Sequence, residues 1–128
     1  MKRQGNKVVD LSIIIPSIRT NKWEELISSV ESSCTKHSWE VIFIGPEDNL
    51  TFHHPKVKFI KDFGSPNICQ HKAMQFSEGK TLHIFSDDCL FEKGAIDECL
   101  NSKAHAVVAN YDEGGDCAVA NFSLNYCY

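Results

Sequence analysis

Residues 8–15 read VVDLSIII and are followed directly by Pro16. Nearly all of these residues are apolar, and most of them are β-branched. A nearly continuous apolar strand is typical of a parallel sheet that is covered on both faces, because both sides of such a strand are buried. The stretch therefore predicts a buried strand of an α/β protein.

The segment after this strand predicts an amphipathic helix. Asn21 is a candidate N-cap, and Glu24 follows three residues later in the capping-box arrangement. Apolar residues then recur at helical spacing, at Trp23, Leu26, Ile27, Val30 and Cys34. This stripe predicts a helix with one buried face.

The rest of the chain alternates between predicted strands and predicted helices. Ser65 supplies an N-cap and Pro66 a first-turn proline for a helix that we expect to end at Gly79. A short helix is expected over 93–100. Strands are predicted at 39–44, 57–60, 81–85 and 106–109. The alternation predicts a three-layer α/β/α fold, Rossmann-like, with a mostly parallel sheet.

The sequence predicts a single domain over 1–128, with a polar tail at 1–7 and an extended segment at 111–128. Asp112–Asp116 is typical of a turn, and Cys117–Tyr128 of a strand or hairpin. The chain stops at Tyr128 without a polar tail, which indicates either the edge of a larger structure or a surface for pairing with another copy.

The composition excludes several classes of function. The chain has 128 residues, 42% of them hydrophobic, and a net charge of −4, which does not favour binding to nucleic acid. No apolar run approaches the length of a transmembrane helix. The six cysteines form no C-x-x-C pair. We therefore expect free thiols in a reducing compartment and a cytoplasmic protein.

Three loops are expected to meet at one edge of the sheet. Crossovers between parallel strands are right-handed, so the loops that follow the strands gather at the carboxyl edge, where ligands bind. Residues 16–19, 45–48 and 86–88 follow three of the predicted strands. This convergence predicts a binding site.

The most informative of these loops is Ser86-Asp87-Asp88. Adjacent carboxylates are costly unless they are solvated, paired or bound to a cation. Mg²⁺ and Mn²⁺ prefer hard oxygen ligands and are often held by one or two carboxylates together with phosphate groups of a substrate. The motif therefore fits a metal bridged to a diphosphate. Capping of the next turn explains the same three residues equally well.

Several stretches together resemble the family 2 glycosyltransferases. Residues 11–17, LSIIIPS, resemble the opening strand and proline of that family. Residues 64–79, followed by SDDCLF at 86–91 and GAI at 94–96, resemble the region around its D-x-D motif. The resemblance is one of order and spacing, and it covers about Asp10 to Leu100.

The resemblance implies a GT-A fold that binds a nucleotide-diphospho-sugar, commonly a UDP-sugar, with Mg²⁺ or Mn²⁺. Asp88 matches the final aspartate of the D-x-D motif and is the first candidate metal ligand, and Asp87 the second. The candidate contacts to the nucleotide-sugar are Pro16, Ser17, Arg19, Glu47, Asp48, Ser86 and Asp87.

The chain departs from the family pattern at three places. Ser86 stands where the first aspartate often lies. Gln70-His71 replaces an Arg-Asn pair, and His71 is expected on the helix surface. In the family, the acceptor site and the catalytic base lie beyond the D-x-D strand, so the chain matches the donor-binding portion. The downstream carboxylates are Asp112, Glu113 and Asp116, and none of them is assigned as the base.

Two alternatives remain open. One is a nucleotide-sugar-binding module or truncated remnant that performs no transfer. The other is a receiver-like signalling domain, although receivers place acidic residues after early strands and here the first strand ends in Pro16-Ser17. A dinucleotide site or a nucleotidyltransferase would need a glycine-rich loop after the first strand, and Ser17–Thr20 contains no glycine.

Overall fold

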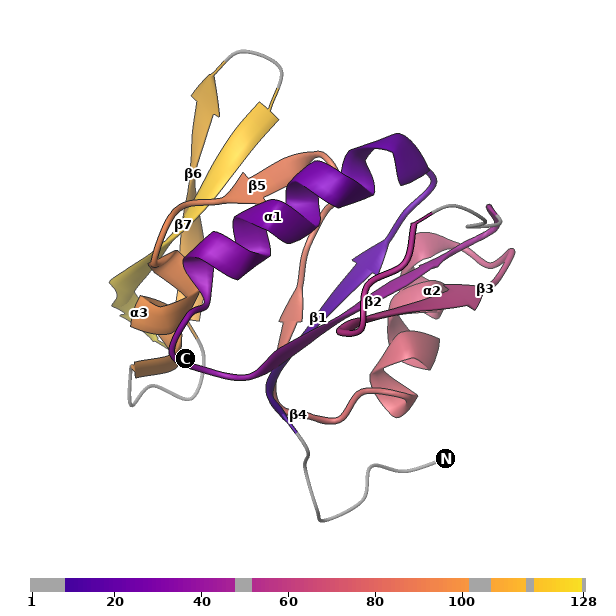
Figure 1. Ribbon diagram of the computed structural model, residues 1–128, viewed down its shortest axis with the longest axis horizontal. Helices are drawn as coiled ribbons and strands as arrows, with labels where there is room; N and C mark the ends of the chain where they lie inside the picture. Colours follow the sequence, from indigo (N-terminus) through magenta and orange to yellow (C-terminus); the bar gives the residue numbers. More distant parts are fainter. Residues whose placement is uncertain (1–8, 48–51, 102–106, 115–116, 128) are drawn as a thin grey trace. The chain divides into compact units, whose positions relative to one another are not determined.

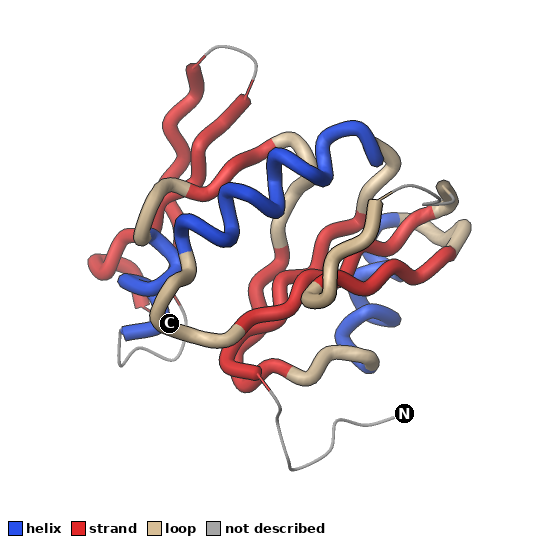
Figure 2. Tube along the Cα trace, in the orientation of Figure 1, coloured by secondary structure: helices blue, strands red, loops and turns tan. Residues whose placement is uncertain are grey.

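The computed structural model describes residues 9–47, 52–101, 107–114 and 117–127. They form two compact units (Figure 1). The first unit comprises the described residues up to Trp23 together with 38–87, and the second comprises 24–37 and the described residues from Asp88 onward. Each unit contains its own β-sheet, drawn in red in Figure 2.

The first unit is built on a four-stranded parallel sheet. Its strand order is β3-β2-β1-β4, and Ile14 of β1 lies opposite Ile42 of β2 and Ile84 of β4. The prediction of an α/β fold with a mostly parallel sheet is confirmed. The strands are β1 (Val9–Pro16), β2 (Trp39–Gly45), β3 (Val57–Lys61) and β4 (Gly79–Ile84).

Helix α2 (Pro66–Gln75) packs against β1 and β2 (Figure 1). Its start agrees with the sequence prediction, because Ser65 is the N-cap, accepts a hydrogen bond from the Ile68 amide at 3.4 Å, and is followed by Pro66. The buried residues between the helix and the sheet are all apolar: Ile14, Ile42, Ile44, Cys69 and Ala73.

A buried carboxylate joins the strands at the amino edge of this sheet. Glu40 of β2 is 5% exposed and accepts hydrogen bonds from the Ser12 hydroxyl of β1 and from the Glu78 amide that precedes β4. Its other oxygen pairs with the Lys58 ammonium of β3 at 2.8 Å. Ser12 also accepts from the Gly79 amide. Every strand of the sheet is thus tied to this group.

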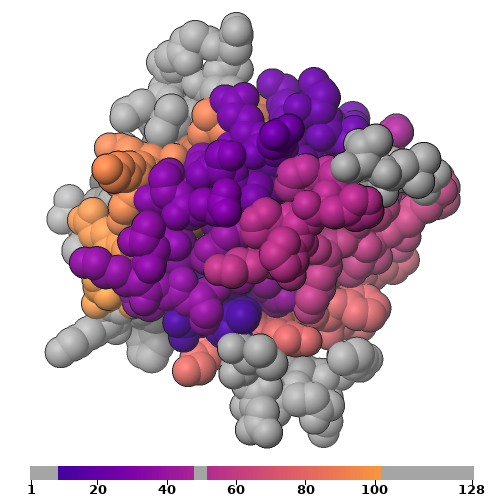
Figure 3. Space-filling model, viewed as in Figure 1, coloured from indigo at the N-terminus to yellow at the C-terminus, as the bar shows by residue number. Residues whose placement is uncertain are grey.

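Strand β3 and residues 52–56 before it lie at the molecular surface, magenta in Figure 3. Lys58 and Lys61 are exposed on this strand, which ends the described sheet on one side. Lysine on an edge strand discourages pairing with another chain, because the charge would have to be desolvated.

Helix α1 spans Trp23–Ser33, and all of it except Trp23 belongs to the second unit. This unit also contains a three-stranded sheet with the order β5-β7-β6. Strand β5 runs parallel to β7, and β6 runs antiparallel to it. The predicted apolar stripe of α1 is confirmed as buried along its length. The remaining elements are β5 (Cys89–Phe91), α3 (Ala95–Asn101), β6 (Val107–Gly114) and β7 (Cys117–Cys127).

Asp97 of α3 holds the turn that follows α1. Its carboxylate accepts hydrogen bonds from the backbone amides of Thr35 at 2.8 Å and Lys36 at 3.0 Å, and His37 Nδ1 lies at 3.0 Å. Burial alone would raise the pKa of Asp97, but these hydrogen bonds hold that pKa far below its ordinary value. The buried carboxylate is therefore ionised and fully partnered.

The structure corrects three expectations about individual elements. Asn21 is not a helix N-cap, because Thr20–Lys22 form a 3₁₀ turn before α1. Gly79 does not end α2. The helix is capped at Phe76, and Gly79 begins β4, where a Cβ would overlap the backbone of β1 at Ser12.

The third correction concerns the end of the chain. The strand predicted at 106–109 does not join the parallel sheet. It is β6, which extends through Asp112 and Glu113 to Gly114, so those residues are strand instead of turn. A hairpin between β6 and β7 explains this, because strands joined by a short connection pair antiparallel. The predicted strand from Cys117 is confirmed as β7, whereas the short strand β5 was not predicted.

None of the helices in the described part of the chain combines the length and the apolar character that crossing a bilayer requires.

Replacing Glu40 with glutamine tests the amino-edge cluster. Burial alone would raise the pKa of Glu40, but Lys58, Ser12 and the Glu78 amide lower it below the ordinary 4.5. Ionised Glu40 therefore contributes its full stability to the folded state above pH 4.5, the ordinary pKa of the group. This contribution is lost as the pH falls through the lowered pKa of the folded state. We expect Glu40→Gln to lower the free energy of unfolding by about 1–3 kcal/mol at pH 7.

The measurement is denaturant unfolding of both proteins at pH 7 and at several pH values below 4.5. The difference between them is expected to shrink as the pH falls. Glu92→Gln, an exposed glutamate outside the cluster, is the matched control. A difference that stays constant with pH would contradict the role of Glu40.

Candidate functional site

A cleft of about 420 Å³ lies in the first unit, at the carboxyl ends of β1, β2 and β4. The chain places β2 and β3 on one side of β1 and β4 on the other, so the direction of strand addition reverses at β1. Ligand sites in open parallel sheets form at such reversals. The cleft is lined by Pro16, Ser17, Ile18, Arg19, Ile44, Gly45, Pro46, Gly64, Pro66, Cys69, Gln70, Phe85, Ser86 and Asp87.

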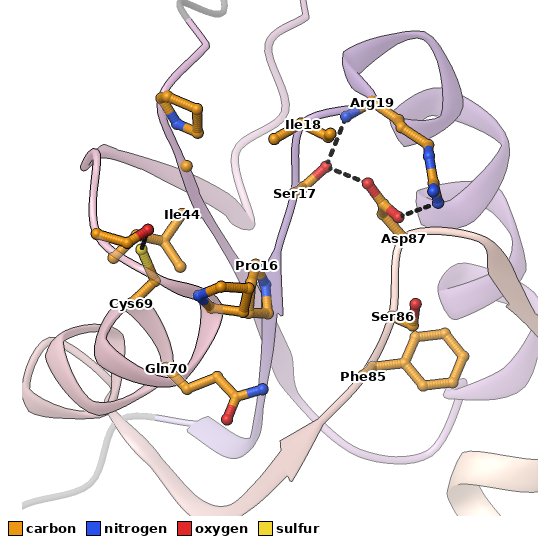
Figure 4. Close-up of a pocket in the computed structure, with 14 residues that line it drawn as sticks. Pro16, Ser17, Ile18, Arg19, Ile44, Cys69, Gln70, Phe85, Ser86 and Asp87 are labelled. Atoms are coloured by element: carbon orange, nitrogen blue, oxygen red, sulfur yellow. Dashed lines mark hydrogen bonds and ion pairs between the residues drawn. The ribbon is translucent and has the colours of Figure 1, made fainter.

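Asp87 is the charged centre of one wall. Its Oδ2 accepts a hydrogen bond from the Ser17 hydroxyl at 2.8 Å, and its Oδ1 forms an ion pair with Arg19 Nη1 at 2.8 Å (Figure 4). The Asp87 side chain is 8% exposed, whereas that of Arg19 is 46% exposed. A buried carboxylate is thus paired with a cation that reaches in from solvent.

The Ser17 hydroxyl is fully used by the protein. It donates to Asp87 and accepts from the Trp23 indole N–H at 2.7 Å and from the Arg19 amide at 3.2 Å. A hydroxyl offers one donor and two acceptor sites, so these three bonds satisfy it. The serine therefore orients Asp87 in this structure.

The backbone at the strand ends brings Ser17 and Asp87 together. The Ser17 amide donates to the Ile44 carbonyl at 2.9 Å, and the Phe85 amide donates to the Ile14 carbonyl at 3.0 Å. Strand β1 is therefore held on both sides up to its end. Gly45 lies beside Ser17, and a Cβ there would overlap the Ser17 carbonyl oxygen. Only glycine permits this close approach.

Trp23 anchors the same corner of the cleft. Its ring stacks on Phe43 with the centroids 4.1 Å apart and the planes 5° apart, and Phe59 packs against it at 5.4 Å. The side chain is fully buried. Because this packing fixes the indole, its N–H points at Ser17 with little freedom to move.

The opposite wall is formed by α2 and the loop before it. Figure 4 shows Cys69 and Gln70 facing Pro16 across the cleft. Burial and the neighbouring Asp62 carboxylate raise the pKa of Cys69, so it is a neutral thiol at pH 7. Asp62 itself pairs with Lys72 at 2.8 Å and caps the Gly64 amide. These contacts tie the loop before α2 to the helix.

The structure brings together five of the residues proposed from the sequence: Pro16, Ser17, Arg19, Ser86 and Asp87. Glu47 is exposed and does not line the cleft, and Asp48 lies outside the described residues. Asp88 is exposed and begins the second unit.

The sequence predicts Trp23 only as a core residue of a helix, with no functional role. The six-residue separation of Trp23 from Ser17 carries no recognisable pattern. The sequence offers one hint, the indole N–H of Trp23, which needs a hydrogen-bond partner when the side chain is buried. The sequence assigns no site role to Gln70, yet Gln70 lines the cleft.

The donor set at Asp87 is compatible with a divalent cation. Oxygen is the preferred donor of Mg²⁺ and Mn²⁺, and the carboxylate already holds a positive charge in Arg19. A second group of possible ligands, Cys34, His37 and Asp97, lies in the second unit. All four acceptor positions of Asp97 are occupied by protein donors, so this group is explained as a structural tie.

No family model, no curated protein and no solved structure matches this chain. Any assignment of function therefore rests on the residues of the site.

The substitution Ser17→Ala tests the orientation of Asp87. It would leave the buried Trp23 N–H and one oxygen of Asp87 without their partner, and unmet buried groups cost about 1–3 kcal/mol. We expect a loss of that size in the free energy of unfolding, measured with denaturant. Ser28→Ala, at an exposed position of α1, is expected to change stability by less than about 0.5 kcal/mol. Equal effects of the two substitutions would contradict the proposed role of Ser17.

Proposed function

We propose that the cleft binds a nucleotide-diphospho-sugar, with a UDP-sugar as the first candidate, together with Mg²⁺ or Mn²⁺. The chain would be the donor-binding part of a glycosyltransferase of the family 2 type, with the GT-A arrangement. One observation carries the proposal. Pro16, Ser17, Arg19 and Asp87, which the family resemblance marks as donor-site residues, line one cleft at the reversal point of a parallel sheet.

Each group in the cleft has a chemical role in this proposal. Asp87 supplies a fixed negative charge for the cation. Asp88, the other candidate ligand from the sequence, follows Asp87 directly but does not line the cleft. Arg19 presents a planar guanidinium, which matches phosphate oxygens better than a lysine would. A bound divalent cation would stabilise the charge that develops on the leaving diphosphate. Ser17 and Trp23 keep Asp87 in place.

Binding and transfer are separate parts of the proposal. Among the described residues that line the cleft, Asp87 is the one carboxylate, and it is held by Ser17 and Arg19. An inverting transfer needs a further carboxylate to deprotonate the acceptor hydroxyl. This observation favours a second candidate, a nucleotide-sugar-binding module without transfer. Release of UDP from a UDP-sugar in the presence of candidate acceptors distinguishes the two.

Calorimetry with UDP tests the binding site. We expect UDP to bind with Mn²⁺ present and not in the presence of a chelator. Asp87→Asn is expected to weaken binding at least about tenfold, roughly 1.4 kcal/mol, because the cation loses its fixed charge. Asp88→Asn measures the contribution of the second proposed ligand in the same way.

Glu92→Gln removes an exposed carboxylate that does not line the cleft and serves as the control. Equal affinity with and without metal would contradict the metal role, as would unchanged affinity in both aspartate variants. Absence of binding by UDP and by other nucleoside diphosphates would contradict the proposed donor site.

A further inference from the structure

The ion pair between Arg19 and Asp87 joins two groups of very different mobility. Asp87 is almost completely buried, and its Oδ2 is fixed by Ser17. Ser17 is in turn fixed by the buried indole of Trp23. Arg19 contributes a side chain that is 46% exposed, from the loop after β1. The carboxylate is therefore the stationary partner, and the guanidinium is the one that can leave.

Arg19 occupies the oxygen that a cation would need. Its Nη1 lies 2.8 Å from Asp87 Oδ1, while Oδ2 accepts from Ser17 (Figure 4). A divalent cation that binds Oδ1 would come close to the guanidinium. Two positive groups on one carboxylate oxygen repel each other, because they lie only a few ångströms apart. The cation and the arginine are therefore competitors for Asp87.

We propose that Arg19 is an internal counter-ion of Asp87, which excludes a divalent cation until a diphosphate arrives and gives the arginine another partner. The inference rests on the proposed function, because it concerns the same cleft. On binding, the guanidinium moves from the carboxylate to the phosphate oxygens, and the cation takes its place on Asp87. Arginine suits this exchange because its planar guanidinium can hydrogen-bond either to a carboxylate or to a phosphate group.

The exchange makes metal and nucleotide bind cooperatively. The metal alone must displace Arg19 from Asp87 without offering it a phosphate, whereas the metal with a diphosphate gives both positive groups a negative partner. By thermodynamic linkage, the nucleotide raises the affinity for metal by the same factor by which the metal raises the affinity for nucleotide. Removing Arg19 should therefore have opposite effects on the two measurements: the metal alone binds more tightly, and the nucleotide binds more weakly.

The experiment titrates Mn²⁺ into the whole chain, with and without UDP, for wild type and Arg19→Gln. Without UDP, we expect Arg19→Gln to bind Mn²⁺ at least about tenfold more tightly than wild type, because the competitor is gone. At saturating Mn²⁺, we expect its affinity for UDP to fall at least about tenfold. Lys22→Gln removes the same charge three residues away, outside the cleft, and is expected to change neither value.

Arg19→Lys is a second variant, which keeps the charge and loses the fork. It is expected to leave Mn²⁺ binding alone close to wild type while weakening UDP, and thermal unfolding verifies that both variants are folded. Unchanged or weaker Mn²⁺ binding by folded Arg19→Gln would overturn the inference. If the wild-type protein binds no nucleotide, the proposed function is wrong. The Mn²⁺ affinities of Arg19→Gln and wild type, compared without nucleotide, still decide whether Arg19 is the counter-ion of Asp87.

Discussion

The carboxylate of Glu40 is the constraint on which the four-stranded sheet depends. A buried charge is tolerated only where its hydrogen bonds are all met, so Ser12, Lys58 and the Glu78 amide must stay where they are. These groups come from β1, β3 and the residue before β4. The cluster therefore aligns the strands with one another at the amino edge. The backbone hydrogen bonds between neighbouring strands extend this alignment to the carboxyl edge.

The same sheet carries a second buried carboxylate at its other edge, and the two differ in their surroundings. Glu40 is held by donors on and beside the neighbouring strands. Asp87 is held on one side by Ser17, whose hydroxyl is fixed by Trp23, and on the other by the half-exposed Arg19. Glu40 ties four strands together, whereas Asp87 lies in the wall of a cleft and is paired with a half-exposed cation.

The sequence predicted the elements whose signals are local. The apolar run before Pro16, the N-cap and proline at Ser65-Pro66, and the stripe from Trp23 to Cys34 are each complete within a few residues, and all three are found. The wrong expectations involve contacts between distant residues. Gly79 has the composition of a helix end, but its place is decided by Ser12, far away in sequence. The strand at 107–114 reads as one more parallel strand until its pairing with β7 is known.

The sequence alone determined that the chain forms a mostly parallel α/β sheet and that the loop with Arg19 and the loop with Asp87 directly follow strands, because apolar runs and the residues that end them are local features of the chain. Only the tertiary structure decided what those residues do to one another. It paired Asp87 with Arg19, satisfied Ser17 through Trp23, and set Gln70 opposite them across the cleft. Such pairings depend on strand register and on the direction of buried side chains, which no short stretch of sequence encodes.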